Sequence, residues 1–355
     1  MNLFIKKWLS SIRKYFFFYR DGFYELPYVA NSPEMTVKSF SSMPFVKNYE
    51  KRNYFTINNL FLDGEGHYQK LEDGLWLIMS NMEVKKNLSF VLHYIYGVPS
   101  DYHFLTLYIN KGQKTVNLPT IHFDIENQDR SWTLFKAGSK SLNTHFKGQK
   151  SIFFTIYFSD EWMRNNIMTN GIFKNKTLEE FFNSSNECLF LPNFLENKKE
   201  VYENLVTSIL DKDENGVKSV LTLKKNTLDI ISTFIEKLED KSVYKANSNL
   251  SEKDLRRIKK AEYILSDSIF TKFPSIDYIS KEIGMSQTKL KTDFKEVYGS
   301  TLYQYYCTKQ MGFAKQMLEK EKITVKEVSY TLGYNNPSKF TAAFKKIYGR
   351  LPSET

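Results

Sequence analysis

The sequence predicts an α+β protein of several domains, in which a β-rich N-terminal part precedes an all-α C-terminal part. Short β-rich runs separated by turn signals fill residues 52–158, and helical patterns follow from Asp160. A basic pattern of 13 residues occurs twice near the C-terminus, at an offset of 50 residues. With 355 residues, of which 41% are hydrophobic, the chain is long enough for two or three domains with their own cores.

The β-rich part, residues 51–160, consists of runs whose length and spacing are typical of a sandwich or barrel rather than of a βαβ array. "YFTINNLFL" alternates hydrophobic and polar residues, and we interpret "DGEGHY" after it as a glycine-rich hairpin turn. Further candidate strands are "GLWLIMSNMEV", "LSFVLHYIYG", "HFLTLYIN", "TIHFDIE", "SWTLFKAG" and "SIFFTIYFS". We therefore expect a jelly-roll-like domain here, after an N-terminal extension over residues 1–50.

Residues 161–240 are expected to be helical, and an apolar stripe makes the segment 217–240 a candidate for dimerisation. The stripe has helical spacing, and its members are Val220, Leu223, Leu228, Ile231, Phe234, Ile235 and Leu238. The sequence leaves open whether this stripe binds a second copy or packs inside its own domain. A polar, turn-rich linker is expected over residues 241–250.

The composition favours a cytoplasmic protein. Its two cysteines, Cys188 and Cys307, form no CxxC motif, which favours a reducing compartment. Basic residues interrupt every apolar run of "MNLFIKKWLSSIRKYFFFYR", and no small-residue cleavage site follows. We therefore interpret the N-terminus as a helix or frayed end rather than as a signal peptide, and we expect no membrane partner.

Positive charge is concentrated in the C-terminal third of the chain. Residues 249–355 hold 19 basic and 12 acidic residues, against 50 and 40 in the whole chain. This segment therefore supplies most of the formal net charge of +10. A basic surface attracts nucleic acid or anionic membranes.

The repeated pattern, "QTKLKTDFKEVYG" and "PSKFTAAFKKIYG", predicts two copies of a capped helix. Ser286 is the N-cap of the first copy, and Asn336 followed by a proline is the N-cap of the second. Gly299 and Gly349 suit left-handed C-terminal caps. Apolar residues at helical spacing face a core, and these are Leu290, Phe294 and Val297 in the first copy and Phe340, Phe344 and Ile347 in the second.

A second short helix and a tight turn precede each copy, which completes the helix-turn-helix pattern twice. The turns contain Gly284 and Gly333, and the small residues Ser280 and Ser329 lie four positions before these glycines, where two helices must cross closely. The second turn is one residue longer. "STLYQYYCTKQMGFAKQMLEKEK", between the copies, predicts a linking helix roughly 30 Å long at ~1.5 Å per residue.

The outward faces of the two repeated helices are polar and basic with several small residues, a combination suited to the major groove of double-stranded DNA. Two such helices can contact successive segments of major groove on one side of a duplex, about 34 Å apart. The residues expected to bind DNA are Gln287, Thr288, Lys291, Thr292 and Lys295 from the first helix, and Ser338, Lys339, Thr341, Ala342, Lys345 and Lys346 from the second.

Residues 251–355 resemble the DNA-binding domain of the AraC/XylS family of transcription regulators. The resemblance rests on "SKEIGMSQTKLKTDFKEVYG", "FAKQMLEK", "VKEVSYTLGYNNPSKFTAAFKKIYG" and the terminal "LPSE". It implies seven helices, including two DNA-reading helices and a linking helix, and an N-terminal regulatory domain that is often cupin-like. It further implies a transcription regulator, here expected to be an activator and a homodimer, with RNA polymerase as partner and room for a small-molecule effector.

Four positions depart from the family pattern. Gln310 stands in the linking helix where the family usually has an arginine, which puts a usual ion pair in doubt. Ser280 and Ser329 replace the usual alanine. Ala342 replaces what is often a larger polar residue, so the second reading helix is short of hydrogen-bond donors.

The histidines raise an alternative function from another class of protein, namely a cupin-type metal-dependent enzyme or sensor that carries a DNA-binding tail. The five are His67, His93, His103, His122 and His145, all in the β-rich part. "HFD" at 122–124 with the distant His145 is the nearest approach to a metal site, but it lacks an HxH arrangement. The sequence contains no P-loop, GxGxxG, GxSxG or HExxH motif. We therefore expect no cofactor, no metal and no enzymatic activity, and interpret the histidines as strand-end or surface residues.

A second alternative is a purely architectural DNA-binding protein without ligand control. The size of the N-terminal half argues against it, because such a protein would not need so large a domain for docking alone.

Overall fold

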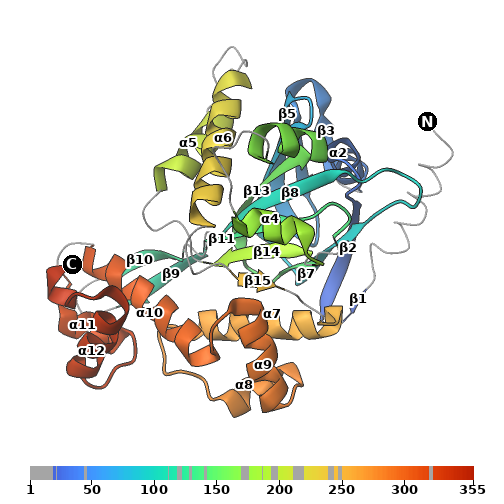
Figure 1. Ribbon diagram of the computed structural model, residues 1–355. Coiled ribbons are helices and arrows are strands. Elements are labelled where there is room, and N and C mark those ends of the chain that lie inside the picture. Colours follow the sequence, from blue (N-terminus) through green and yellow to red (C-terminus); the bar gives the residue numbers. More distant parts are fainter. Residues whose placement is uncertain are drawn as a thin grey trace. The chain divides into compact units, whose positions relative to one another are not determined.

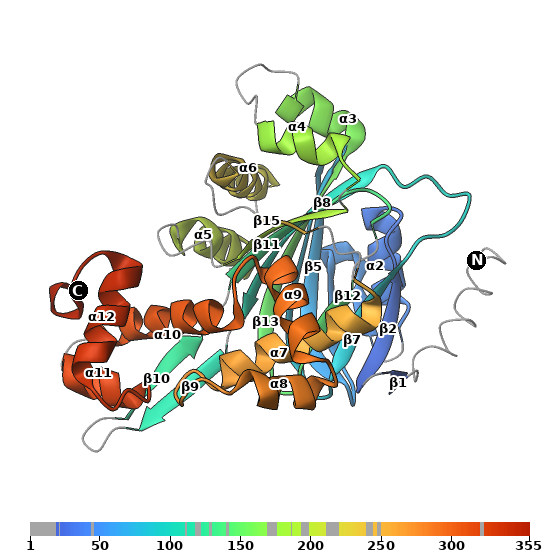
Figure 2. The same ribbon diagram turned by 60° about the horizontal axis from the view of Figure 1, so that its bottom comes forward.

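The computed structural model divides into two compact units, which are considered separately (Figures 1 and 2). The first comprises Met1–Lys111 and Asp129–Asn247, and the second comprises Gly112–Gln128 and Ser248–Thr355. The expectations for the first 18 residues lie outside the described part of the chain. The structure describes residues 19–20, 22–43, 46–110, 112–117, 122–127, 130–139, 142–168, 176–185, 187–192, 199–210, 220–238, 244–246, 250–319 and 323–355.

A nine-stranded sheet forms the centre of the first unit. Its strand order is β15-β14-β11-β8-β13-β6-β5-β4-β3, and neighbouring strands pair antiparallel. Its strands are β3 (Val46–Tyr49), β4 (Tyr54–Asn58), β5 (Leu62–Glu72), β6 (Leu75–Val84), β8 (Tyr102–Asn110), β11 (Arg130–Phe135), β13 (Lys150–Ser159), β14 (Cys188–Pro192) and β15 (Tyr244–Ala246).

A four-stranded sheet packs on one face of the large sheet, with helix α2 (Pro33–Ser41) beside it (Figure 2). A buried cluster joins the layers and contains Tyr28 and Leu92 from the small sheet and Ile78 and Phe104 from the large one. The strands of the small sheet, in spatial order, are β1 (Tyr19–Arg20), β2 (Phe23–Val29), β7 (Leu88–His93) and β12 (Leu142–His145), and β2 pairs parallel with β7. The predicted β-rich character of this part is therefore confirmed, and of the two predicted alternatives, sandwich or barrel, the two packed sheets form a sandwich.

Helices cover the other face of the large sheet (Figures 1 and 2). Because side chains alternate along a strand, Leu77 and Met79 of β6 face these helices whereas Ile78 faces the small sheet. Trp132 of β11 packs on Phe234 of α6, with ring centroids 5.8 Å apart. The helical segments of this layer are α3 (Asp160–Met163), the π-helical turn η2 (Arg164–Met168), α4 (Lys176–Asn183), α5 (Lys199–Leu210) and α6 (Val220–Lys237).

Two predicted boundaries differ from the structure. The predicted extension, residues 1–50, includes β2 and α2, which belong to the sandwich because Leu26 and Tyr28 of β2 are buried in apolar clusters with residues of the large sheet. The predicted linker includes β15, which extends the large sheet by pairing with β14. These three elements are hard to predict from the sequence because they are short and flanked by polar residues.

The predicted hairpin turn "DGEGHY" is wrong, because these residues lie inside strand β5. Gly64 and Gly66 allow neighbouring residues of the sheet to pack closely against the backbone of β5, and they form no turn. A Cβ atom on Gly66 would lie 2.1 Å from the ring of Phe55, and one on Gly64 would lie 2.4 Å from the carbonyl oxygen of Asn81. The turn that joins β5 to β6 contains Gly74 instead, whose φ of +77° is in the left-handed region.

The apolar stripe predicted as a dimer seam is largely core. Leu223, Ile231, Phe234, Ile235 and Leu238 are buried in the cluster between α6 and the large sheet. The sheet needs this cover, because its face carries large side chains such as Trp132. The stripe members that stay exposed are Val220 and Leu228, at 40% and 37%.

The second unit is helical, apart from the hairpin of β9 (Gly112–Asn117) and β10 (His122–Asn127) that is grouped with it. Its described part contains six α-helices and one short 3-10 helix, in place of the seven helices that the family resemblance implies. They are α7 (Glu252–Asp267), α8 (Ile276–Ile283), α9 (Gln287–Tyr298), α10 (Leu302–Glu319), α11 (Val325–Thr331), α12 (Pro337–Tyr348) and η3 (Pro352–Glu354).

Helix α10 connects two separate apolar cores. One surrounds α8 and α9 and includes Leu290 and Phe294, and the other surrounds α11 and α12 and includes Phe340 and Phe344. The first half of α10 contributes Leu302, Tyr305 and Tyr306 to one core, and the second half contributes Met311, Phe313, Ala314 and Met317 to the other. Among the described residues of the whole chain, we find no helix with the length and apolarity needed to cross a bilayer.

We expect His103→Gln to flatten the pH dependence of stability of the first unit. Burial lowers the pKa of His103, although the Asp160 carboxylate acts in the opposite direction. The folded unit then binds fewer protons than the unfolded chain, so stability is undiminished above about pH 6.5 and is lost as the pH falls through that value, by at most ~1.4 kcal/mol per pH unit. All four tryptophans precede residue 248, so their fluorescence in urea reports on this unit. An equal loss of stability in wild type and variant on acidification would contradict the prediction.

We expect Ile235→Asp to unfold the first unit and Leu228→Asp to be tolerated, although both residues belong to the predicted stripe. Ile235 is 6% exposed, and an unpaired buried carboxylate costs several kcal/mol, whereas Leu228 is 37% exposed and its replacement should cost less than about 1 kcal/mol. Tryptophan fluorescence during urea unfolding measures both. Equal destabilisation by the two substitutions would show that α6 is packed differently.

Candidate nucleic-acid interface

The two repeated helices begin and end at the predicted caps. The Ser286 hydroxyl accepts a hydrogen bond from the N–H of Lys289 (3.3 Å), and the Asn336 side chain accepts one from the N–H of Ser338 (2.8 Å). Each helix ends at a left-handed glycine, with φ of +68° at Gly299 and +73° at Gly349. These caps set both ends of α9 and α12 independently of any ligand.

Both tight turns use the same backbone hydrogen bond. The N–H of Met285 donates to the carbonyl of Ser280 (3.0 Å), and the N–H of Tyr334 donates to the carbonyl of Ser329 (2.9 Å). The two serines are buried, and each hydroxyl donates to the carbonyl three residues earlier in its own helix. Serine therefore serves where the family usually has alanine, because it satisfies its own hydroxyl and stays small.

All five predicted DNA-binding residues of α9 lie on its exposed face. The amide of Gln287 donates to Asp277 (3.2 Å), and the Thr292 hydroxyl donates to the carbonyl of Thr288 (3.1 Å). Lys291 and Lys295 are exposed, and neither forms an ion pair with any residue that the structure describes. Their charges are therefore available to an anionic partner.

The outward face of α12 is basic and carries no carboxylate. Helix α12 contains no Asp or Glu, so nothing on this helix neutralises its lysines. Thr341 is half-buried, and the other predicted residues of this helix are exposed: Ser338, Lys339, Ala342, Lys345 and Lys346.

A hollow of about 720 Å³ adjoins the exposed face of α9. Its lining includes Lys291, Thr292, Lys295 and Glu296 of α9, and Thr301 and Tyr303 at the start of α10. Thr301 and Tyr303 are not among the residues predicted from the sequence. The sequence signal that could have identified them is the T-x-x-Q spacing of Thr301 and Gln304, which is typical of a helix start. In the structure the Gln304 side chain accepts a hydrogen bond from the backbone N–H of Thr301 (3.1 Å), and α10 begins there beside α9.

Gln310 ties α10 to helices on both sides. Its amide nitrogen donates to the carbonyls of Ile269 and Leu332, both at 2.8 Å, and lies 3.0 Å from the Tyr306 hydroxyl. Ile269 follows the end of α7, and Leu332 is the C-cap residue of α11. A neutral amide thus satisfies two helix-end carbonyls in the place where the family usually has an arginine.

The buried ion pair of α10 lies one position earlier. Lys309 is 3.0 Å from Glu262 of α7 and 3.3 Å from the Ser266 hydroxyl. Burial by itself would raise the pKa of Glu262, but the charge of Lys309 and hydrogen bonds from Ser266, Lys309 and Tyr305 outweigh it and lower that pKa. The carboxylate is therefore ionised at neutral pH, and the pair joins the linking helix to α7.

A model of the "Helix-turn-helix domain" family matches residues 279–355, which contain α9 and α12 together with their turns. The C-terminal domain is an AraC-type helix-turn-helix domain.

Curated relatives match part of this chain. The chain is 24% identical over 150 residues to the xylose operon regulatory protein of Escherichia coli K12, and 30% identical over 90 residues to the F1 operon positive regulatory protein of Yersinia pestis. These alignments cover 42% and 25% of this chain, and the chain spans only 34% and 30% of those relatives. The crystal structure of ToxT from Vibrio cholerae O395 is 17% identical, with coverage of 80% of this chain and 97% of ToxT and a TM-score of 0.30.

The described histidines are engaged in packing and hydrogen bonds rather than gathered around a site. His103 accepts the N–H of Ala137 at Nδ1 (3.0 Å) and contacts Asp160 through Nε2 (2.5 Å), so both ring nitrogens are occupied. His145 packs edge-on against Phe90 and Phe153. Both lie near strand ends as predicted, but both are buried, so the surface interpretation is wrong for them. The side chains of "HFD", residues 122–124, lie outside the described part.

Within the AraC-type domain, we expect Gln310→Leu to loosen α11 and α12 together. Leucine fills the space but leaves the carbonyls of Ile269 and Leu332 without a donor, at a cost of ~1–3 kcal/mol for each buried group. Gln316→Leu is the matched control, because this half-buried glutamine on the same helix should tolerate the change within about 0.5 kcal/mol. Hydrogen exchange of peptides from α11 and α12 measures the effect. Equal protection in both variants would contradict the bridging role of Gln310.

Proposed function

We propose that this protein is a sequence-specific, DNA-binding transcription regulator that reads two successive major-groove segments with α9 and α12. The supporting observation is the pair of capped helices in one unit, each with an exposed polar face that carries unpaired lysines. The linking helix α10 has 18 residues and is therefore about 27 Å long, close to the ~34 Å between major-groove segments on one side of a duplex.

The two helices are proposed to contribute differently to recognition. Helix α9 presents Gln287, Thr288 and Lys291, whose side chains can donate hydrogen bonds to base edges such as guanine O6 and N7. Helix α12 presents the short side chains of Ser338 and Ala342, which suit close approach and thymine methyl contacts. Its lysines suit phosphates, which position a protein without reading sequence.

The remaining proposals concern the whole protein. The names of the relatives, an operon regulatory protein and an operon positive regulatory protein, support a regulator and favour an activator that contacts RNA polymerase. A sandwich of about 240 residues precedes the helix-turn-helix unit and suits a regulatory domain, for which we propose a small-molecule effector, homodimer formation and a cytoplasmic location. The rival function, a cupin-type metal-dependent enzyme, would require stoichiometric metal in the purified protein.

The full chain should bind duplex DNA with an affinity that falls steeply as salt increases. Each phosphate neutralised by a lysine or arginine releases counterions and contributes about 0.9 to the slope of log K against log salt. Fluorescence anisotropy with a labelled random duplex measures this slope. A flat salt dependence, or the recovery of no preferred site from a random DNA pool, would refute the proposed function.

Lys291→Ala should change which bases are preferred, and Lys345→Ala should weaken binding to all sequences about equally. A good base contact contributes ~1–3 kcal/mol of discrimination, whereas the loss of one phosphate contact should lower the salt slope by about one. Selection of preferred sites from a random DNA pool, followed by salt titrations on the selected site, separates the two effects. The division of labour is wrong if Lys345→Ala rewrites the selected motif while Lys291→Ala preserves it.

A further inference from the structure

The two helix-turn-helix motifs carry a lysine at the same repeat position, but only one of the two is neutralised. Lys289 of α9 and Lys339 of α12 are 50 residues apart and both are the third residue of their helix. Lys289 lies 2.8 Å from Asp293 and 3.3 Å from Asp254. Ala343 occupies the position corresponding to Asp293 in α12, and Lys339 has no ion-pair partner among the described residues.

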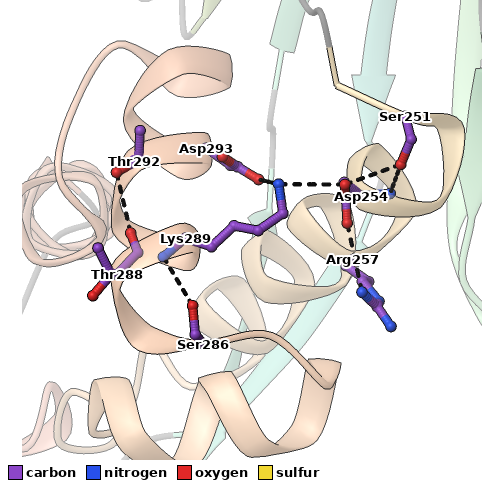
Figure 3. A network of polar contacts seen from close by, with 8 residues as sticks. All are labelled: Ser251, Asp254, Arg257, Ser286, Thr288, Lys289, Thr292 and Asp293. Atoms are coloured by element: carbon purple, nitrogen blue, oxygen red, sulfur yellow. Dashed lines mark hydrogen bonds and ion pairs between the residues drawn. The ribbon is translucent and has the colours of Figure 1, made fainter.

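The two carboxylates come from different helices, so Lys289 joins α9 to α7 (Figure 3). Asp254 lies in the first turn of α7, and one of its oxygens meets both the Ser251 hydroxyl (3.0 Å) and the ammonium of Lys289. The other oxygen lies 3.5 Å from Arg257. The same Ser251 hydroxyl accepts the N–H of Asp254 (3.1 Å), so the N-cap of α7 and the bridge to α9 share one carboxylate.

The two carboxylates of this network are less exposed to solvent than those of an ordinary surface ion pair. The Asp293 side chain is 8% exposed and that of Asp254 is 19% exposed. Burial would raise the pKa of Asp254, but hydrogen bonds from Ser251 and Lys289 lower it overall. A buried carboxylate needs a cation close by, and Lys289 supplies one to both. Any rotation or sliding of α9 on α7 would separate Lys289 from at least one of them.

We propose that Asp254, Lys289 and Asp293 form a positioning network that fixes the orientation of the first reading helix, so that its base contacts are made in one geometry. The proposal rests on the proposed function, DNA recognition by α9. Thr288 and Thr292 flank Lys289 and Lys291 on this helix and depend on the same orientation (Figure 3). Lys289 is therefore a positioning residue rather than a DNA contact.

The charge arrangement distinguishes this role from phosphate binding. Two carboxylates within ion-pair distance cancel the charge that Lys289 would offer to DNA, so it should release no counterion on binding. Lys339, at the corresponding position of α12, keeps its full charge. The repeat thus supplies a matched control within the same chain: the same residue and the same helix position, with and without acidic partners.

The test compares Lys289→Met with Lys339→Met in the full-length protein. Methionine removes the charge and keeps most of the length of the side chain. Each variant is taken through selection from a random DNA pool, then through salt titration on the site selected by the wild type. Lys339→Met should lower the salt slope by about one and keep the motif. Lys289→Met should leave the slope unchanged and lose about tenfold discrimination at one or more base positions of one half-site, with the other half-site intact.

Two further variants separate positioning from stability. Asp254→Asn removes a negative charge near DNA, so it should strengthen non-specific binding while discrimination at the same half-site falls. A general loss of folding could not raise the non-specific affinity and lower the base discrimination at the same time. Lys289→Arg can still bridge both carboxylates and should restore the wild-type motif. Circular dichroism melting confirms that each variant is folded at the assay temperature.

The outcomes discriminate between the proposals. If Lys289→Met lowers the salt slope as Lys339→Met does and leaves the motif unchanged, Lys289 is a phosphate contact and the positioning role is refuted. If Lys289→Met and Asp254→Asn leave both the slope and the motif unchanged, the network positions nothing and the inference is also refuted. If the wild type itself selects no motif, the proposed function fails before the variants are compared.

Discussion

The helix-turn-helix unit depends on one buried amide, that of Gln310. The unit has two apolar cores instead of one, and α10 is the helix that contributes to both. Apolar packing alone does not fix the rotation of one core relative to the other, because it is nearly non-directional. The hydrogen bonds of Gln310 to Ile269 and Leu332 are directional, and they join the end of α7 to the end of α11. Together with the Lys309–Glu262 ion pair, these hydrogen bonds fix the orientation of one helix-turn-helix motif relative to the other.

Much of this unit could be predicted from sequence because its signals are local. The signals that predict each helix involve residues within one or two turns of one another. They are the N-caps Ser286 and Asn336, the C-caps Gly299 and Gly349, and the spacing of the apolar residues. Because the pattern is repeated, each of these signals occurs twice. The exposed face of α9 followed directly, since a helix with one buried stripe must expose the opposite one. The predicted site residues of α9 are consequently exposed, although the sequence did not reveal the hollow that Tyr303 lines.

The errors arose where the decisive partner is distant in sequence. "DGEGHY" has the composition of a turn, yet Gly64 and Gly66 are required by Asn81 and by the ring of Phe55, which only the folded sheet brings close. The stripe on α6 has the same appearance whether a second copy or its own sheet covers it, and only the folded structure shows that it buries Trp132 of its own sheet. The ion pair of Lys289 with Asp254, 35 residues earlier, is likewise a contact that only the folded unit reveals, although no role was predicted for Lys289.

The two motifs share a turn but differ in how they are anchored, and this difference bears on how they recognise DNA. Helix α9 is seated in an apolar core through Leu290 and Phe294, and an ion-pair network with α7 is added to that core. Helix α12 is held by Phe340 and Phe344 in an apolar core and carries no carboxylate. Reading bases requires hydrogen bonds aligned to within a few tenths of an ångström, whereas a lysine reaches a phosphate from many positions. The added network on α9 suits the proposed first task, and the lysines of α12, which have no ion-pair partner among the residues that the structure describes, suit the proposed second one. A duplicated motif can thus be adapted to two tasks by changing the residues behind the reading face while the turn stays the same.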